Sequence, residues 1–124
     1  MNDNKITSYR DLIVWQRAKD FVIALYRSTE QFPKHELFGL TSQIRRAAVS
    51  IPSNIAEGFN RRTKKEQVQF LRVAYGSGAE VETQLIIAKE LGYLEDKEYN
   101  ILKEALDEVM KMLNTLISKF NKSQ

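Results

Sequence analysis

Apolar side chains recur every three or four residues along most of this chain, the spacing of an amphipathic α-helix. Four segments show this pattern, with expected bounds of 11–31, 37–58, 64–91 and 96–120. No segment alternates apolar and polar residues as a strand does. Connections of roughly four to six residues favour antiparallel neighbours. The pattern therefore predicts a single all-α domain over residues 1–124, an up-down-up-down four-helix bundle with short disordered ends.

Several residues mark the expected ends of these helices. Ser8 or Asp11 can cap the first helix, and Gly58 can end the second. The segment TKKE at 63–66 predicts a capping box, in which the Thr63 hydroxyl and the Glu66 carboxylate each accept a hydrogen bond from a backbone amide. Gly92 is a suitable stop for the third helix.

The second segment contains a proline, Pro52, where an ordinary helix interior would lose about 3 kcal/mol. The apolar residues on both sides of Pro52 nevertheless keep one helical phase, which favours a single helix kinked at this residue. Ser50, Ser53 and Asn54 could satisfy backbone groups that the bend sets free. The alternative is a turn between two short helices.

Composition excludes several kinds of site. The chain has no cysteine and a single histidine, His35, so we expect no disulfide, no metal centre and no catalytic thiolate. No G-x-S-x-G elbow is present, and His35 lies in a polar stretch where we expect it to be solvated. We therefore expect a non-enzymatic protein without a cofactor. Without a signal-peptide core or a bilayer-length apolar run, the sequence indicates a cytoplasmic protein with no membrane contact.

Positive charge is concentrated in the second quarter of the chain. Residues 41–65 carry six basic and one acidic side chain, whereas residues 66–124 carry seven basic and ten acidic ones. Four of these cations crowd the expected loop between the second and third helices: Arg61, Arg62, Lys64 and Lys65. Such a cluster suits the phosphate backbone of a nucleic acid. The alternative is a solvated basic loop.

Two helices carry a second apolar strip beside their core-facing one. On the second helix the strip comprises Val49, Pro52 and Ala56, and on the third it comprises Val73, Ile87 and Leu91, beside Gly76. A monomeric bundle would leave both strips exposed, so they favour self-association. Scattered surface hydrophobic residues are the alternative.

Two carboxylates of the third helix, Glu80 and Glu82, need partners if they lie near the core. Arg45 or Arg46 of the second helix could supply them, within one bundle or between adjacent subunits. An acid–base carboxylate pair is the functional alternative, but the two side chains point to different sides of the helix.

Four stretches of the sequence resemble a known family. They are DLIVWQRA, QIRRAAVSIPSNIAEG, FLRVAYGSGAEVETQL and LGYL, and together they cover nearly the whole chain. They resemble the bacterial four-helix bundle proteins first noticed in intervening sequences of 23S rRNA genes. The matching motif positions are Arg45, Arg46, Ser50, Pro52, Asn54, Glu57 and Gly58 on the second helix, and Ser77, Glu80, Glu82 and Thr83 on the third. Gly78 departs from the larger apolar residue that relatives often have.

The resemblance implies a left-handed four-helix bundle that assembles as a homopentamer and has no known enzymatic activity. Its fold is similar to that of accessory proteins of diversity-generating retroelements, which bind nucleic acid and a reverse transcriptase. We therefore expect an oligomeric scaffold that binds nucleic acid through its basic loop. The alternative is a protein-binding or structural module without a nucleic-acid partner.

Overall fold

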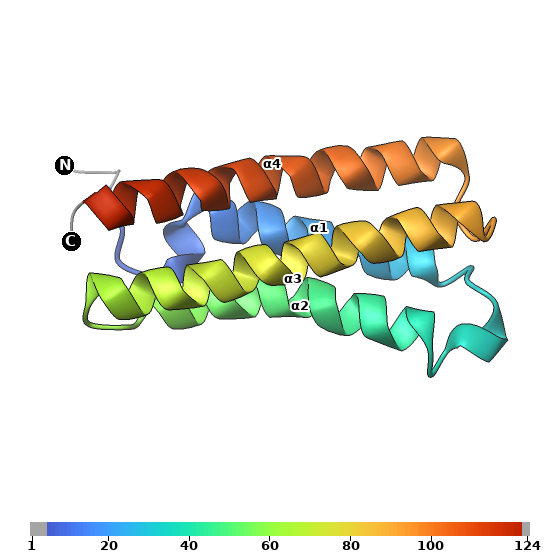
Figure 1. Ribbon diagram of the computed structural model, residues 1–124, viewed down its shortest axis with the longest axis horizontal. Helices are drawn as coiled ribbons and strands as arrows, with labels where there is room; N and C mark the ends of the chain where they lie inside the picture. The colour runs from blue at the N-terminus through green and yellow to red at the C-terminus, as the bar shows by residue number, and fades with distance from the viewer. Residues whose placement is uncertain (1–4, 123–124) are drawn as a thin grey trace.

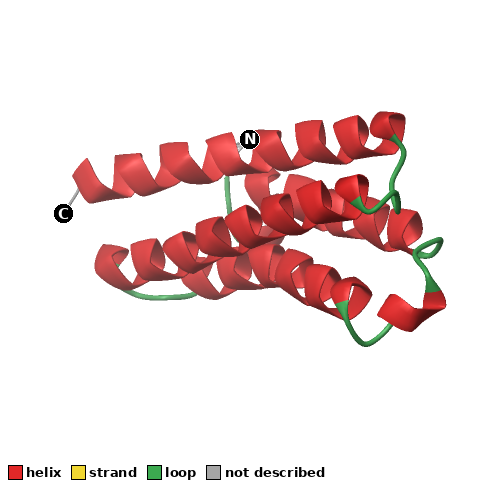
Figure 2. Cartoon of the chain, turned by 45° about the vertical axis from the view of Figure 1, so that its right-hand side comes forward, coloured by secondary structure: helices red, strands yellow, loops and turns green. Residues whose placement is uncertain are grey.

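The computed structural model describes residues 5–122 of the 124-residue chain. Its helices are α1 (Ile13–Thr29), α2 (Leu40–Phe59), α3 (Lys64–Glu90) and α4 (Asp96–Lys122), with short 3-10 helices η1 (Tyr9–Asp11) and η2 (Lys34–Glu36). All regular structure in this part of the chain is helical (Figure 2). The predicted all-α four-helix bundle is confirmed. The outermost residues of the predicted disordered ends, 1–4 and 123–124, lie outside the described residues.

The four long helices form a bundle in which each one packs on two neighbours. α2 lies between α1 and α3, and α4 lies between α3 and α1, while the two diagonal pairs do not pack directly in the described residues. The connections α1–α2 and α3–α4 lie at one end of the molecule, and the α2–α3 connection lies at the other (Figure 1). The bundle therefore has four sides, each formed by two adjacent helices.

The core contains the apolar stripe of every helix. Its largest fully buried residues are Phe21, Leu25, Ile44, Ile51, Ile55, Val81, Leu85, Leu102, Leu106, Val109 and Leu113. Tyr26 and Tyr75 follow the helical spacing of these stripes, but each is 39% exposed. Both lie at the edges of their stripes, where a long side chain can reach solvent.

The first helix begins later than predicted. Ser8 caps η1 instead of α1, and the Asp11 carboxylate accepts hydrogen bonds from the backbone amides of Thr7 and Ser8. These local bonds produce a separate 3-10 turn, and α1 starts at Ile13 with no side-chain cap. They also hold the pKa of Asp11 below its usual value.

The second helix begins at Leu40, three residues after the predicted start. Leu37 and Phe38 stand in the connection between η2 and α2 and are 51% and 93% exposed. The Glu36 Oε1 atom accepts a hydrogen bond from the Leu40 amide at 3.1 Å, so a side chain caps the helix from outside it. The apolar spacing at Leu37 had placed that residue wrongly in the helix.

α2 is continuous through Pro52, so the alternative of two short helices joined by a turn is wrong. The kink at this residue and the left-handed twist of the bundle stay predictions. The Asn54 side chain donates to the Ser50 carbonyl at 2.8 Å and to the Ser50 Oγ atom at 2.9 Å. Asn54 therefore binds a backbone carbonyl one turn earlier. It does not bind the Ala48 carbonyl, which loses its helical hydrogen bond because Pro52 has no N–H.

α3 follows its predicted bounds closely because both ends carry strong local signals. The Thr63 hydroxyl accepts from the Glu66 amide at 3.1 Å, which confirms half of the capping box. The Glu66 carboxylate accepts from the Thr63 hydroxyl instead of a backbone amide. At the other end Gly92 has a φ of 81°, and the Tyr93 amide donates to the Ala88 carbonyl, as in a Schellman motif.

Gly58 lies inside α2 rather than ending it, and it allows α2 and α3 to approach closely. A Cβ atom at this position would lie 3.1 Å from the Phe70 Cβ atom and 3.2 Å from the Gln67 carbonyl oxygen. Gly78 also lies in a close helix contact: it is buried, and a Cβ atom there would overlap the Met110 sulfur on α4. Gly76, by contrast, has open space around it.

We predict opposite effects of two glycine substitutions on the free energy of unfolding, measured by urea denaturation. Gly58→Leu should lower it by about 1–3 kcal/mol, because the new side chain would push α2 and α3 apart. Gly76→Ala should raise it by about 0.5–1 kcal/mol, because alanine favours an exposed helix position and meets no neighbour. Equal effects of the two variants would contradict this account of the α2–α3 contact.

Candidate nucleic-acid interface and charged motif

The basic loop lies at the same end of the bundle as the last turn of α4 (Figure 1). Lys64, at the start of α3, places its Nζ atom 4.5 Å from the centre of the Phe120 ring on α4. Lys119 and Lys122 stand in the final turn of α4. The tertiary structure thus brings cations from the end of the chain to the loop that the sequence singled out.

Within residues 5–122, Arg61 is the one cation of the loop with a carboxylate partner. Its guanidinium forms an ion pair with Glu57 one turn earlier and stacks 4.7 Å from the centre of the Phe70 ring. Glu57 therefore offsets part of the positive charge of the four-cation loop. Glu57, a motif position, has a local role in holding this arginine against the bundle.

Arg62 and Lys65 are exposed and have no ion-pair partner within residues 5–122. Lys64 and Lys65 also lie in the first turn of α3, where the helix dipole repels positive charge and the nearby Glu66 offsets part of that repulsion. A phosphate group bound here would relieve the remaining repulsion. Arg62 and Lys65 are therefore the loop cations most available to a polyanion.

Arg45 contacts α1, not α3. Its Nε atom donates to the Thr29 hydroxyl at 2.9 Å, and its guanidinium donates to the Tyr26 carbonyl and stacks 4.6 Å from the centre of the Tyr26 ring. The predicted pairing of Arg45 with Glu80 or Glu82 is wrong within one chain. Arg45 instead binds the C-terminal turn of α1, where a cation is favourable.

Arg46 and Glu80 line one groove of about 430 Å³ between α2 and α3, without forming an ion pair. Phe38, Ser50 and Ser77 line the same groove. Within the described part of the chain, Glu80 accepts a single side-chain hydrogen bond, a long one of 3.5 Å from Gln84. The predicted intrachain ion pair of Arg46 is therefore also wrong, and a contact between subunits stays a prediction.

Glu82 faces the other side of α3, where it shares a groove with Asp107 and Lys111 of α4. Asp107 accepts a hydrogen bond from Lys103 at 2.9 Å. This bond raises the pKa of Lys103, and the negative charge of Glu82 adds a smaller effect in the same direction. The two glutamates therefore lie in separate grooves, an arrangement that offers no paired acid and base.

The motif serines join α2 to α3 directly. The Ser77 hydroxyl donates to the Ser50 Oγ atom at 2.9 Å, and the same atom accepts from the Asn54 amide. Ser50, Asn54 and Ser77 therefore form a small polar network at the helix contact. Their role in the described chain is to align these two helices.

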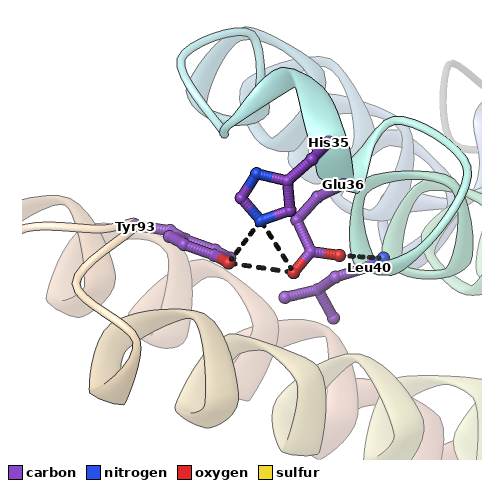
Figure 3. Close-up of polar contacts among 4 residues, drawn as sticks. All are labelled: His35, Glu36, Leu40 and Tyr93. Carbon is purple, nitrogen blue, oxygen red and sulfur yellow. Dashed lines mark hydrogen bonds and ion pairs between the residues drawn. The ribbon is translucent and has the colours of Figure 1, made fainter.

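A second polar cluster lies at the opposite end of the bundle, where η2 meets the α3–α4 connection (Figure 3). The Tyr93 hydroxyl donates to the Glu36 Oε2 atom at 2.9 Å, and the His35 Nε2 atom lies 4.0 Å from the same oxygen. The Leu40 amide, followed by the Tyr93 hydroxyl, lowers the pKa of Glu36. Hydrogen bonding to Glu36 raises the pKa of Tyr93. The His35 side chain is 74% exposed, as expected for a solvated histidine.

The sequence pattern missed this cluster because Glu36 and Tyr93 are 57 positions apart and belong to different connections. The only local signal was a glutamate four residues before the true start of α2. Within residues 5–122 no three carboxylate or histidine side chains gather in a way that could hold a metal ion. No helix in this range is both long and apolar enough to cross a bilayer.

Comparison with known proteins agrees with the observed fold. Residues 10–115 match the family described as 23S rRNA-intervening sequence protein. This match spans most of the chain, so the protein belongs to that family. A crystal structure of a protein of unknown function from the S23 ribosomal protein family of Bacteroides thetaiotaomicron has the same fold, with a TM-score of 0.79 and 20% identity over 86% of this chain and 96% of that one. No curated protein matches the chain in sequence.

We predict that the Glu36 cluster makes the folded protein less stable as the pH falls into the acidic range. The pKa of Glu36 is lowered in the folded state, so its stabilising contacts are present above about pH 4.3, the ordinary glutamate value, and are lost as the pH falls through the lower folded pKa. Thermal melting between pH 3 and 6 measures this loss. Glu36→Gln should melt at a lower temperature than wild type near pH 6, and this difference should be smaller at pH 3. The control Glu30→Gln should have the melting temperature of wild type at both pH values.

Proposed function

We propose that this protein is a non-catalytic, homo-oligomeric scaffold that binds nucleic-acid phosphates through its basic end. The observation that carries the proposal is the gathering of Arg62, Lys64, Lys65 and the last-turn lysines of α4 at one end of the bundle. Membership in the 23S rRNA-intervening sequence family is compatible with this proposal. The absence of cysteine from the sequence suits a cytoplasmic protein.

The basic end favours backbone contacts over base reading. Its cations are exposed lysine and arginine side chains beside a helix N-terminus, the kind of group that contacts phosphate and carries little sequence information. Phe59 is half-buried and Phe120 is covered by Lys64, which leaves little aromatic surface for stacking on single strands.

Self-association is supported by the apolar residues that the described chain leaves uncovered. Val73, Ile87 and Leu91 of the predicted second strip on α3 are 49%, 44% and 55% exposed. On α2, Val49 is 39% exposed, while Pro52 and Ala56 are half-buried beside α1. The stoichiometry of five comes from the resemblance alone. A purely protein-binding or structural module would use the same apolar surfaces without the basic end.

The first test of this proposal is the mass of the protein in solution. Light scattering in moderate salt at micromolar concentration should give a species of about five times the 14.4 kDa chain mass. A monomer under these conditions would rule out the homo-oligomer.

The second test is the salt dependence of nucleic-acid binding. Affinity for duplex DNA or structured RNA, measured by fluorescence anisotropy, should fall with salt at a log–log slope of about −0.9 per phosphate neutralised. The double variant Arg62→Gln/Lys65→Gln should flatten this slope without dissociating the oligomer. The matched control, Lys34→Gln/Lys97→Gln, removes the same charge from the opposite end and should leave the slope unchanged. If wild type shows no binding at low salt, the protein-binding or structural module is the better account.

A further inference from the structure

At the basic end of the bundle, α1 is shorter than the helices around it. Ile13, its first residue, lines one groove with Met112, whereas α4 continues to Lys122 (Figure 1). The part of α4 beyond Met112 is about 15 Å long. Over this length the segment 5–12, which includes η1, takes the place of α1 beside the other three helices.

A cavity of about 500 Å³ lies at this end, between α2, α3, α4 and segment 5–12. It reaches the core at Ile55 and Leu71, which are only 1% and 5% exposed. The other residues that line this end cavity are Ile6, Leu12, Gly58, Phe59, Gln67, Leu116 and Phe120. Small-molecule sites in proteins have volumes of about 300–1,000 Å³, so the end cavity is large enough for such a ligand.

Local hydrogen bonds in the sequence produce this cavity. The Asp11 carboxylate accepts from the backbone amides of Thr7 and Ser8, which holds η1 as a separate turn. The chain is extended at Leu12, so α1 does not continue to the end of the bundle. Ile6 is left 50% exposed at the cavity wall, and hydrocarbon that entered the cavity would cover it.

The lining of the end cavity favours an alkyl chain over other ligands. Its one polar side chain is that of Gln67, whose amide nitrogen already donates to the Arg61 carbonyl at 2.9 Å. A nucleobase or a sugar would bring polar groups that lose their hydrogen bonds to water against the apolar walls. A partner helix is about 10 Å across, which is also the distance between packed helices, so it is too wide to enter between them.

A cation stands at the edge of the end cavity. The Lys64 Nζ atom lies 4.5 Å from the centre of the Phe120 ring, which lines the cavity. Within residues 5–122 Lys64 has no ion-pair partner. The exposed Arg62 and Lys65 adjoin it in the loop and add positive charge. The charge at the edge of the cavity therefore favours a ligand with an anionic head group.

We propose that the end cavity binds a single-chain anionic amphiphile, a fatty-acid carboxylate. Its alkyl chain packs against Leu116 and Phe120, and its carboxylate binds the Lys64 ammonium. The two contacts are compatible because Lys64 and the Phe120 ring lie at the same edge of the cavity. The inference goes beyond the proposed nucleic-acid binding, since it concerns a different ligand in a cavity that a phosphate backbone does not enter.

Isothermal titration calorimetry with dodecanoate tests this inference, below the critical micelle concentration and without nucleic acid. We expect saturable binding to a single site on each chain. Dodecyltrimethylammonium has the same alkyl chain with a cationic head, and it should bind at least about tenfold more weakly. Butanoate has the same carboxylate with a short chain, and it should show no measurable binding because it buries little apolar area.

Two variants test the residues, each with a matched control. Ile6→Glu places a carboxylate on the cavity wall and should weaken dodecanoate binding at least about tenfold. Ile101→Glu makes the same change at a similarly exposed residue near the start of α4, at the opposite end, and should bind as wild type does. Lys64→Gln should weaken binding at least about threefold, whereas Lys97→Gln at the opposite end should not. Circular dichroism checks that each variant is folded.

Methyl NMR of isoleucine-labelled protein locates the ligand. The signals of Ile6 and Ile55 should shift when dodecanoate is added, because both residues line the end cavity. The signals of Ile23 and Ile101 should stay in place, because these residues lie on other surfaces of the bundle.

Several results would overturn the inference. Absence of dodecanoate binding, or equal affinity for dodecanoate and dodecyltrimethylammonium, would rule out a site for an anionic amphiphile. Saturable binding that leaves the Ile6 signal unchanged would rule out the end cavity. Binding to phosphatidylglycerol vesicles without binding to free dodecanoate would indicate a membrane surface as the partner instead. The salt dependence of nucleic-acid binding is measured without amphiphile, so either proposal can fail while the other stands.

Discussion

The close contact between α2 and α3 is the constraint on which the other features of this bundle depend. Gly58 lets the two backbones approach at one end, and the Ser50–Ser77 hydrogen bond aligns them near the middle. This alignment sets the basic loop beside the end of α4 and places Glu80 beside Arg46 in one groove. A change in the spacing of these two helices would therefore alter both the charged end and the polar groove.

Pro52 is compatible with this contact because it lies on the side of α2 that faces α1. There it lines a groove with Trp15, while the residues that pack on α3 and on the core keep their helical phase. The loss of one backbone amide is therefore confined to a position away from the closest helix pair. Arg45 stabilises the same α1–α2 side by binding the last turn of α1.

The two ends of the bundle differ in chemistry, although both are connections between helices. One end gathers lysine and arginine side chains, and within residues 5–122 Glu57 is the one carboxylate that pairs with a loop cation. At the other end the Glu36 carboxylate accepts hydrogen bonds from the Leu40 amide and the Tyr93 hydroxyl, and so joins η2, α2 and the α3–α4 connection. The basic end therefore leaves positive charge available to a partner. At the Glu36 end the carboxylate is bonded within the chain, and these bonds fix the connection that carries Phe38.

Local patterns in the sequence determined the fold, because helical periodicity and end signals act within a few residues. The TKKE segment and Gly92 set the ends of α3 by local hydrogen bonds, and four amphipathic segments can bury their stripes only against each other. Only the tertiary structure decided the start of α2, where Tyr93, 57 positions away, binds the Glu36 carboxylate that caps Leu40 and overrides an apolar spacing continuing to Leu37. It also decided the partners of Arg45, Glu80 and Glu82, since periodicity assigns a side chain to a face of its helix but not to the helix it meets. Contacts between residues far apart in the chain depend on how all four helices pack, and no local pattern contains that information.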